Sequence, residues 1–156
     1  MLNYQKRFWR EKVFNYVSAA AALFFILTVM AMFFYPGGTR RDPTAQGYTF
    51  FRNFFSDLGA IHTYPGAPNF ISASLFFSAM TLAGLSVILF SIAFPQLFQK
   101  PGAGRIPGML GSLVGIITGL CFVGIAFTPA DILTYAHGQF SAWGFRFFML
   151  AAFFWA

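Results

Sequence analysis

Charged residues are scarce in this sequence: ten lysines and arginines and four acidic residues make up 9% of its 156 residues. Soluble globular domains carry about 25% charged residues, so this scarcity, together with long apolar runs, excludes an ordinary soluble domain. The single cysteine, Cys121, lies within an apolar run. It excludes an internal disulfide and a cysteine-based metal cluster, and we interpret it as an inert core thiol.

Apolar residues are correspondingly abundant, at 58% of the chain, with 24 phenylalanines. Four apolar runs, bounded by Pro and Gly, predict transmembrane helices at about 13–35, 69–94, 109–128 and 139–156. As a helix, the first run would extend about 34 Å, enough to cross a bilayer. We therefore expect an all-α integral membrane helical bundle with four transmembrane helices, formed by residues 1–156 as a single membrane domain.

The fourth run is the shortest, and the chain stops there without a polar anchor. From Gln139 to Ala156 it would extend about 27 Å, barely a crossing. Either the C-terminus lies at the inner interface near Trp155, or the chain is the front part of a longer protein. We expect the second, with further helices after Ala156.

The net charge of +6 indicates topology rather than a nucleic-acid partner, because no aromatic-basic motif on a polar domain accompanies it. Basic residues gather before the first predicted helix and after the second, where the positive-inside rule expects them. We therefore expect a cell-membrane protein with a cytoplasmic N-terminus, which places residues 36–68 and 129–140 outside. The cations concerned are Lys6, Arg7, Arg10, Lys12, Lys100 and Arg105.

Residues 48–59 divide into an apolar and a polar face when read at helical spacing. This pattern predicts a short amphipathic interfacial helix in the first outer loop, ended by Gly59 in a left-handed conformation. The apolar face comprises Phe50, Phe51, Phe54, Phe55 and Leu58, and the polar face comprises Thr49, Arg52, Asn53, Ser56 and Asp57.

The outer segments hold both histidines and every acidic residue except Glu11. Ionisable groups at membrane depth are costly and tend to be paired or functional. The candidate catalytic residues are Asp57, Asp131 and His137. The candidate ligands of a divalent metal such as zinc are His62, His137, Asp57 and Asp131. The candidate substrate-binding or structural polar residues are Arg52, Asn53, Ser56, Asn69 and Arg146.

Three interpretations of these residues compete. In the structural one, Arg52 and Asp57 pair with Asp131 and Arg146 and fix the interfacial helix to the bundle. In the catalytic one, a metal or an acid–base pair hydrolyses a lipid-like substrate, although no compact motif such as His-Glu-x-x-His is present. In the third, Asp and His carry protons or bind a small solute for transport or sensing.

The transport alternative needs more room than four short spans provide, unless the chain forms an oligomer or is incomplete. Several single residues also have structural explanations. Asp42 before Pro43 suits a helix cap, Asp131 a cap of a short turn, and Asn69 either a cap or a position inside the bundle. Glycines spaced four apart in the third run favour close packing against a small-residue face on the second. These are Gly111, Gly115 and Gly119 on one side, and Ser74, Ser78 and Thr81 on the other.

The sequence resembles the multi-pass membrane proteins grouped as domain of unknown function 998. The resemblance covers the chain from about Val13 to its end, and its motifs are short. It implies a helical bundle, commonly of about six spans, in a prokaryotic cytoplasmic membrane. It transfers no catalytic role, but it directs attention to Asn53, Ser56, Asp57, Asp131 and His137. The motifs are Tyr35-Pro36-Gly37-Gly38, the segment Asn53 to Gly59, Gly66 with Asn69, and Thr128-Pro129-Ala130-Asp131 followed by His137.

Overall fold

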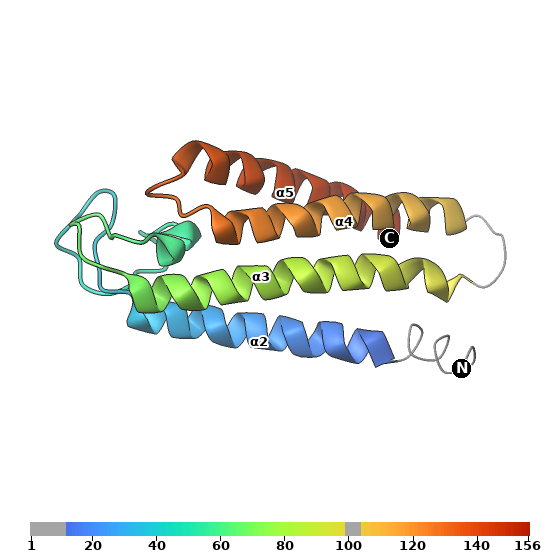
Figure 1. Ribbon diagram of the computed structural model, residues 1–156, viewed down its shortest axis with the longest axis horizontal. Coiled ribbons are helices and arrows are strands. Elements are labelled where there is room, and N and C mark those ends of the chain that lie inside the picture. Colours follow the sequence, from blue (N-terminus) through green and yellow to red (C-terminus); the bar gives the residue numbers. More distant parts are fainter. Residues whose placement is uncertain (1–11, 99–103) are drawn as a thin grey trace.

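The computed structural model describes residues 12–98 and 104–156. These residues form four α-helices and two short 3-10 helices, with no β-strand among them (Figure 1). Lys6, Arg7, Arg10 and Lys100, on which the predicted orientation partly depends, lie outside the described residues. The elements are α2 (Val13–Phe34), η2 (Phe55–Gly59), α3 (Phe70–Ala93), η3 (Phe94–Leu97), α4 (Arg105–Phe127) and α5 (Thr134–Trp155).

The all-helical architecture is confirmed, and the predicted ends of α2 and α3 are correct to within one residue. Two helices begin earlier than predicted: α4 at Arg105 rather than 109, and α5 at Thr134 rather than 139. Pro107 lies in the first turn of α4, where its missing N–H breaks no helical hydrogen bond. The first turn of α5 is polar, so a search for apolar runs does not detect it.

The predicted number of membrane-spanning helices is wrong by the criteria of length and composition. Within the described residues, three segments are long and apolar enough to cross a membrane: Val13–Phe34, Phe70–Leu97 and Arg105–Phe127. Helix α5 has 22 residues, which is sufficient length. It does not qualify because Gln139 and Arg146 interrupt its apolar residues.

The helices pack in chain order, α2 against α3, α3 against α4 and α4 against α5, each antiparallel to the next (Figure 1). Gly84 of α3 meets Gly119 of α4 so closely that a Cβ added at Gly84 would lie 2.6 Å from the Gly119 carbonyl oxygen. The predicted packing role of Gly119 is confirmed. The predicted partner face is not, since Ser74 and Ser78 are exposed. The small residue that α3 places against Gly119 is Gly84.

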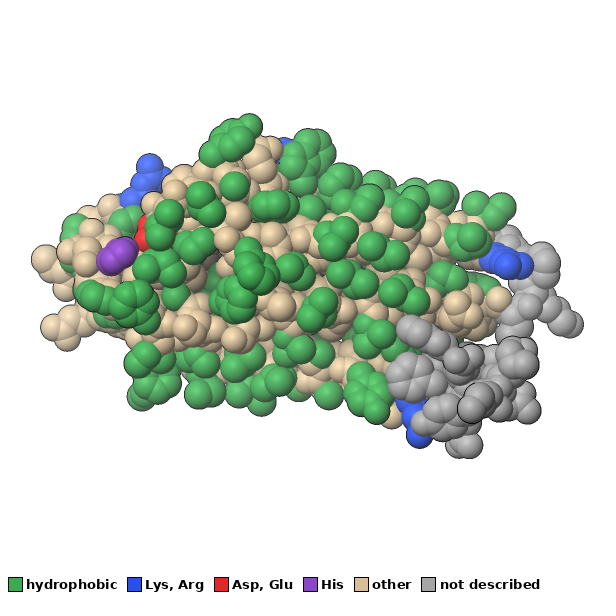
Figure 2. All heavy atoms as spheres, in the orientation of Figure 1, with side chains coloured by type: hydrophobic (Ala, Val, Ile, Leu, Met, Phe, Trp, Pro, Cys, Tyr) green, Lys and Arg blue, Asp and Glu red, His purple; other side chains and the backbone are tan. Residues whose placement is uncertain are grey.

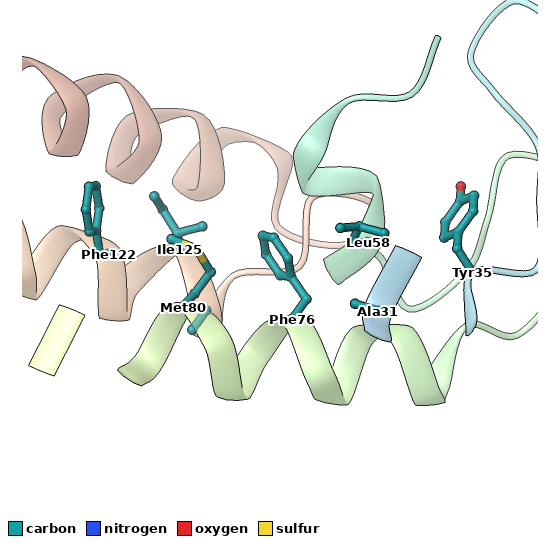
Figure 3. Close-up of a cluster of buried hydrophobic side chains, with 8 residues drawn as sticks. Ala31, Tyr35, Leu58, Phe76, Met80, Phe122 and Ile125 are labelled. Carbon is teal, nitrogen blue, oxygen red and sulfur yellow. The ribbon is translucent and has the colours of Figure 1, made fainter. Parts of the chain in front are cut away.

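Large apolar side chains cover the helices along their length, whereas the visible histidine and acidic side chains lie at one end (Figure 2). That end is formed by residues 35–69 and 128–133, which we call the cap. Inside the bundle, a row of buried side chains runs from Phe122 through Met80 and Phe76 to Leu58 of the cap (Figure 3). Leu58 therefore fastens the cap to the apolar core.

The predicted amphipathic helix over 48–59 is absent. Residues 49–52 form a turn, in which the Arg52 and Asn53 N–H groups both donate to the Thr49 carbonyl at 2.9 Å, and only Phe55–Gly59 is helical, as a 3-10 turn. The side chain of Asn53 accepts the Thr49 N–H, and that of Asp57 accepts the Phe54 N–H. Such local side-chain bonds compete with helix formation.

Gly59 also departs from its predicted role, because the described glycines with positive φ do not include it. It lies in η2 against the ring of Phe76, where an added Cβ would clash. The expected apolar face is split as well. Phe51 is 94% exposed, whereas Leu58 is fully buried. Gly59 thus permits a close approach of the cap to α3 and does not end an α-helix.

Candidate functional site

Asp57 is the buried acidic residue of the cap, with 7% of its surface exposed. Its Oδ2 accepts hydrogen bonds from the Asn53 side-chain amide at 3.0 Å and from the Phe54 N–H at 2.9 Å. Its Oδ1 accepts one from the Tyr64 hydroxyl at 3.2 Å. All three donors are uncharged, so they fix the position of the carboxylate without neutralising it.

Asn69 joins the first cap segment to α3. It occupies the position before the helix but makes no side-chain capping bond. Its side chain is turned toward the first cap segment instead of capping α3. Its side chain is 1% exposed, and its Nδ2 donates to the carbonyl oxygens of Ala60 at 2.8 Å and Leu58 at 3.2 Å. Ser72 adds a bond to the Leu58 carbonyl at 3.0 Å. Asn69 is a structural anchor of the cap.

Asp131 connects the two cap segments. Its Oδ1 accepts the Ile61 N–H and its Oδ2 the His62 N–H, each at 3.0 Å. The Nδ1 of His62 lies 3.7 Å from Oδ2. The prediction that Asp131 caps its own turn is wrong, because its carboxylate reaches instead to residues about 70 positions earlier in the chain.

His137 is buried at the start of α5, and its Nδ1 lies 2.6 Å from the Thr128 carbonyl oxygen. A carbonyl oxygen can only accept, so Nδ1 carries the proton and donates it. This bond ties the end of α4 to the start of α5. His137 therefore has a structural partner, separate from Asp57 and Asp131.

A pocket of about 180 Å³ opens between the end of α2 and the two cap segments. It brings together three of the predicted residues, Asp57, His62 and Asp131, but not His137. Among the described residues, no three His, Cys, Asp or Glu side chains lie close enough to hold a metal ion, so the four predicted metal ligands do not form a common group. The lining residues are Tyr35, Asp57, Ala60, His62, Thr63, Tyr64, Ala130 and Asp131.

The predicted ion pairs of the structural interpretation are not formed. In the part of the chain that the structure describes, neither Arg52 nor Arg146 makes a salt bridge with Asp57 or Asp131. Arg146 is exposed on α5, with its guanidinium 5.0 Å from the centre of the Trp143 ring. Ser56 lies in η2 and outside the pocket lining. Hydrogen bonds to backbone groups, rather than ion pairs, hold the cap together.

The Asp57 charge affects the tyrosines around it. Burial raises the pKa of the Tyr35 hydroxyl well above its usual value, and the nearby Asp57 carboxylate adds to the effect. Burial also raises the pKa of Tyr64, as do the charge of Asp57 and the hydrogen bond with it, while the charge of Arg40 acts in the opposite direction. Both hydroxyls therefore remain protonated donors at neutral pH.

Sequence reasoning missed Tyr35, Thr63 and Tyr64 as parts of the site. Tyr35 follows the last residue of α2 and precedes Pro36, and Tyr64 precedes Pro65. Both tyrosines therefore lie before a proline in loop structure, Tyr64 in a turn, where functional side chains are common. Position next to a breaker was the one available signal. It does not distinguish a pocket residue from an ordinary loop residue.

Within the described residues, fold and composition together define a helical bundle with three candidate membrane-spanning helices and, in the cap at one end, a pocket that contains two carboxylates. In comparisons with protein-family models, with curated proteins and with solved structures, nothing matches the chain. The resemblance to domain of unknown function 998 stays a prediction. The pocket is therefore the feature that bears on function.

Proposed function

We propose that this chain is a multi-pass membrane protein whose cap faces outward and contains a ligand-binding site. The observation that carries the proposal is the convergence of Asp57 and Asp131 on one pocket from two distant segments. Each carboxylate is held by at least two hydrogen bonds to uncharged donors. Groups fixed in this way lose little conformational entropy when a ligand arrives, which favours binding.

The membrane orientation that we propose places α2, α3 and α4 across the bilayer, with the N-terminus in the cytoplasm. Helix α5 packs along α4, and we propose that it lies in the same layer, with Arg146 extending toward the headgroups beside Trp143. The exposed rings of Phe50 and Phe51 would then enter the outer headgroup boundary. The cap would rest at the lipid surface with its pocket accessible from outside.

The ligand-binding proposal can be tested by filling the pocket. Ala130 lines it, so Ala130→Phe adds a ring where a ligand would lie. Ala142→Phe adds the same ring at an exposed position on α5 and serves as the matched control. Native mass spectrometry of the purified proteins, titrated with a polar lipid extract, should show a saturable adduct on the wild type and on Ala142→Phe. Ala130→Phe should lack it.

Equal adduct formation by all three proteins would contradict the proposal, because it would show that lipids bind only the apolar helix surfaces. Circular dichroism and thermal unfolding of the two variants verify that the added ring has not disrupted the fold. An adduct that does not saturate would indicate the same non-specific binding.

A second candidate function is hydrolysis of a lipid-like substrate. The observation that favours it is the approach of His62 to Asp131 at the pocket, since a carboxylate beside an imidazole can orient it as a general base. The side chain of His62 is 55% exposed and accessible to a substrate. This pair replaces the predicted combination with His137. Release of a fluorophore from an ester lipid, absent in His62→Gln, would support hydrolysis.

No turnover above the His62→Gln background would exclude that activity for the ester tested. The transport or sensing alternative, metal dependence and oligomer formation stay predictions. The first of these would need a polar path between α3 and α4, where Gly84 and Gly119 bring the two backbones into contact.

A further inference from the structure

The negative charge of the pocket lacks a strong cationic partner. Asp57 is bonded to an amide, a backbone N–H and a phenol, and Asp131 to two backbone N–H groups. Within residues 12–98 and 104–156, no lysine or arginine forms a salt bridge with either carboxylate, and only His62 approaches one, at 3.7 Å. Two fixed carboxylates without a counter-ion attract a cation.

Both carboxylates also keep acceptor capacity. An ionised carboxylate offers about four lone-pair sites. The protein donors fill two of them on Asp131 and three on Asp57. A cation that donates several hydrogen bonds can use the remaining sites, and such charge-assisted bonds are stronger than neutral ones.

The surroundings favour a small organic cation. Metal-ligating side chains do not come together in threes among the described residues, while the pocket volume of about 180 Å³ accommodates a group of several atoms. Thr63 is 6% exposed and lines the pocket, and its hydroxyl has no hydrogen-bond partner. The hydroxyl oxygen is itself shielded from solvent, so a ligand need not bond to Thr63.

The other charged and titratable groups around the pocket are compatible with a cation. Tyr35 and Tyr64 remain protonated and neutral. Arg40 is exposed, and its charge lowers the pKa of Tyr64. It forms no salt bridge with either carboxylate. His62 is the remaining cationic candidate, and it carries a full charge only when protonated.

We propose that the pocket binds a primary ammonium group, from either an ethanolamine-type lipid headgroup or a free small amine. This inference rests on the proposed ligand-binding function and specifies the ligand class. The ammonium would donate to the free acceptor sites of Asp131 and Asp57, against the ring of Tyr64. A trimethylated ammonium has no N–H to donate, so it binds more weakly at such acceptors.

The experiment uses the full chain in nanodiscs of constant ionic strength, because salt screens weak charge effects. One arm varies the lipid, comparing phosphatidylethanolamine, phosphatidylcholine and phosphatidylglycerol in native mass spectrometry. The other arm titrates ethanolamine and choline into phosphatidylcholine discs by calorimetry. We expect at least tenfold tighter binding of the primary ammonium than of the trimethylated one, and the arm that shows it identifies a lipid or a soluble source.

Matched variants locate the effect. Asp131→Asn and Asp42→Asn each remove one acidic group from the cap, but the carboxylate of Asp42 bonds to Thr44 at an exposed site and lies outside the pocket lining. Asp131→Asn should weaken ammonium binding about tenfold, and Asp42→Asn less than twofold. If Asp131→Asn alters the fold, the selectivity of the wild type among the three lipids still decides the question.

The outcomes distinguish the two proposals. Two results would overturn the ammonium inference: preferential binding of phosphatidylglycerol, or equal binding of ethanolamine and choline. If that binding is lost in Ala130→Phe, the ligand-binding site itself stays in place. Failure of every probe to distinguish the wild type from Ala130→Phe would overturn both. If Asp42→Asn weakens ammonium binding as much as Asp131→Asn does, the attraction comes from the general surface charge of the cap, and the inference is overturned.

Discussion

Removal of the Asn69 side chain should loosen the cap selectively. In Asn69→Ala, the Ala60 carbonyl loses its bond of 2.8 Å, and the Leu58 carbonyl keeps only that from Ser72. An orphaned buried carbonyl costs about 1–3 kcal/mol. The Oδ1 of Asn69 is buried without a partner, and its removal offsets part of that cost. We therefore expect a net loss of about 2 kcal/mol in the local stability of the cap.

Hydrogen exchange measured by mass spectrometry in detergent reports this quantity directly. At about 1.4 kcal/mol per tenfold change, amides in peptides covering 54–69 should exchange about 30-fold faster in Asn69→Ala. The helix interior of α4 should be unaffected, because local opening does not require unfolding of the bundle. Ser72→Ala removes one bond from a carbonyl that retains another, so its effect should be about two- to tenfold.

Two results would refute this reasoning. If Asn69→Ala accelerates the cap amides no more than Ser72→Ala does, the bonds to Ala60 and Leu58 do not hold the cap. If α4 accelerates equally, the cap and the bundle unfold as one unit. The double variant provides a further test, since only in it does the Leu58 carbonyl lose both side-chain donors. The loss of local stability in the double variant should therefore exceed the sum of the losses in the two single variants.

Three further predictions concern packing, titration and orientation. Gly84→Ala should destabilise the bundle by about 1–3 kcal/mol. Gly138→Ala is the control, because its added Cβ contacts no other atom, and it should leave the stability unchanged. Thermal unfolding in detergent measures the stability of both variants. The pKa of Tyr64, from the difference in absorbance titration between the wild type and Tyr64→Phe, should lie above about 10. In Asp57→Asn this pKa should fall only part of the way back, because burial is the larger cause of the rise. Arg41→Cys, at an exposed position of the cap and in a cysteine-free background, should react with a membrane-impermeant maleimide in intact cells. Protection until lysis would reverse the proposed orientation.

The sequence predicted the helical elements well because their signal is local. A run of apolar residues bounded by Pro and Gly predicts a helix of bilayer length whatever surrounds it. The predictions therefore placed α2 and α3 to within one residue. They failed where a polar residue belongs to a helix, as in the first turn of α5, and where side chains capture backbone N–H groups, as Asn53 and Asp57 do before and within η2.

The predicted topology also placed Asp57, His62 and Asp131 on one side of the bundle, and the structure has all three in the cap at one end. The prediction did not identify which of these residues meet. The pairing of Asp131 with the Ile61 and His62 N–H groups joins residues about 70 positions apart, and no periodicity records such a contact. The same holds for His137, whose bond to the Thr128 carbonyl removes it from the group in which it was predicted.

Helix length and hydropathy are properties of consecutive residues, so an apolar helical bundle with a polar end follows from the sequence. The tertiary structure was needed to show that Asp57 and Asp131 accept hydrogen bonds from backbone and uncharged side-chain donors rather than from arginines. It was also needed to show that Tyr35, Thr63 and Tyr64 complete a pocket with them. A carboxylate accepts hydrogen bonds from the donors that the folded chain places within reach, whether it is buried, as Asp57 is, or exposed, as Asp131 is. Those donors are fixed by the packing of Leu58, Gly59 and Asn69 against α3.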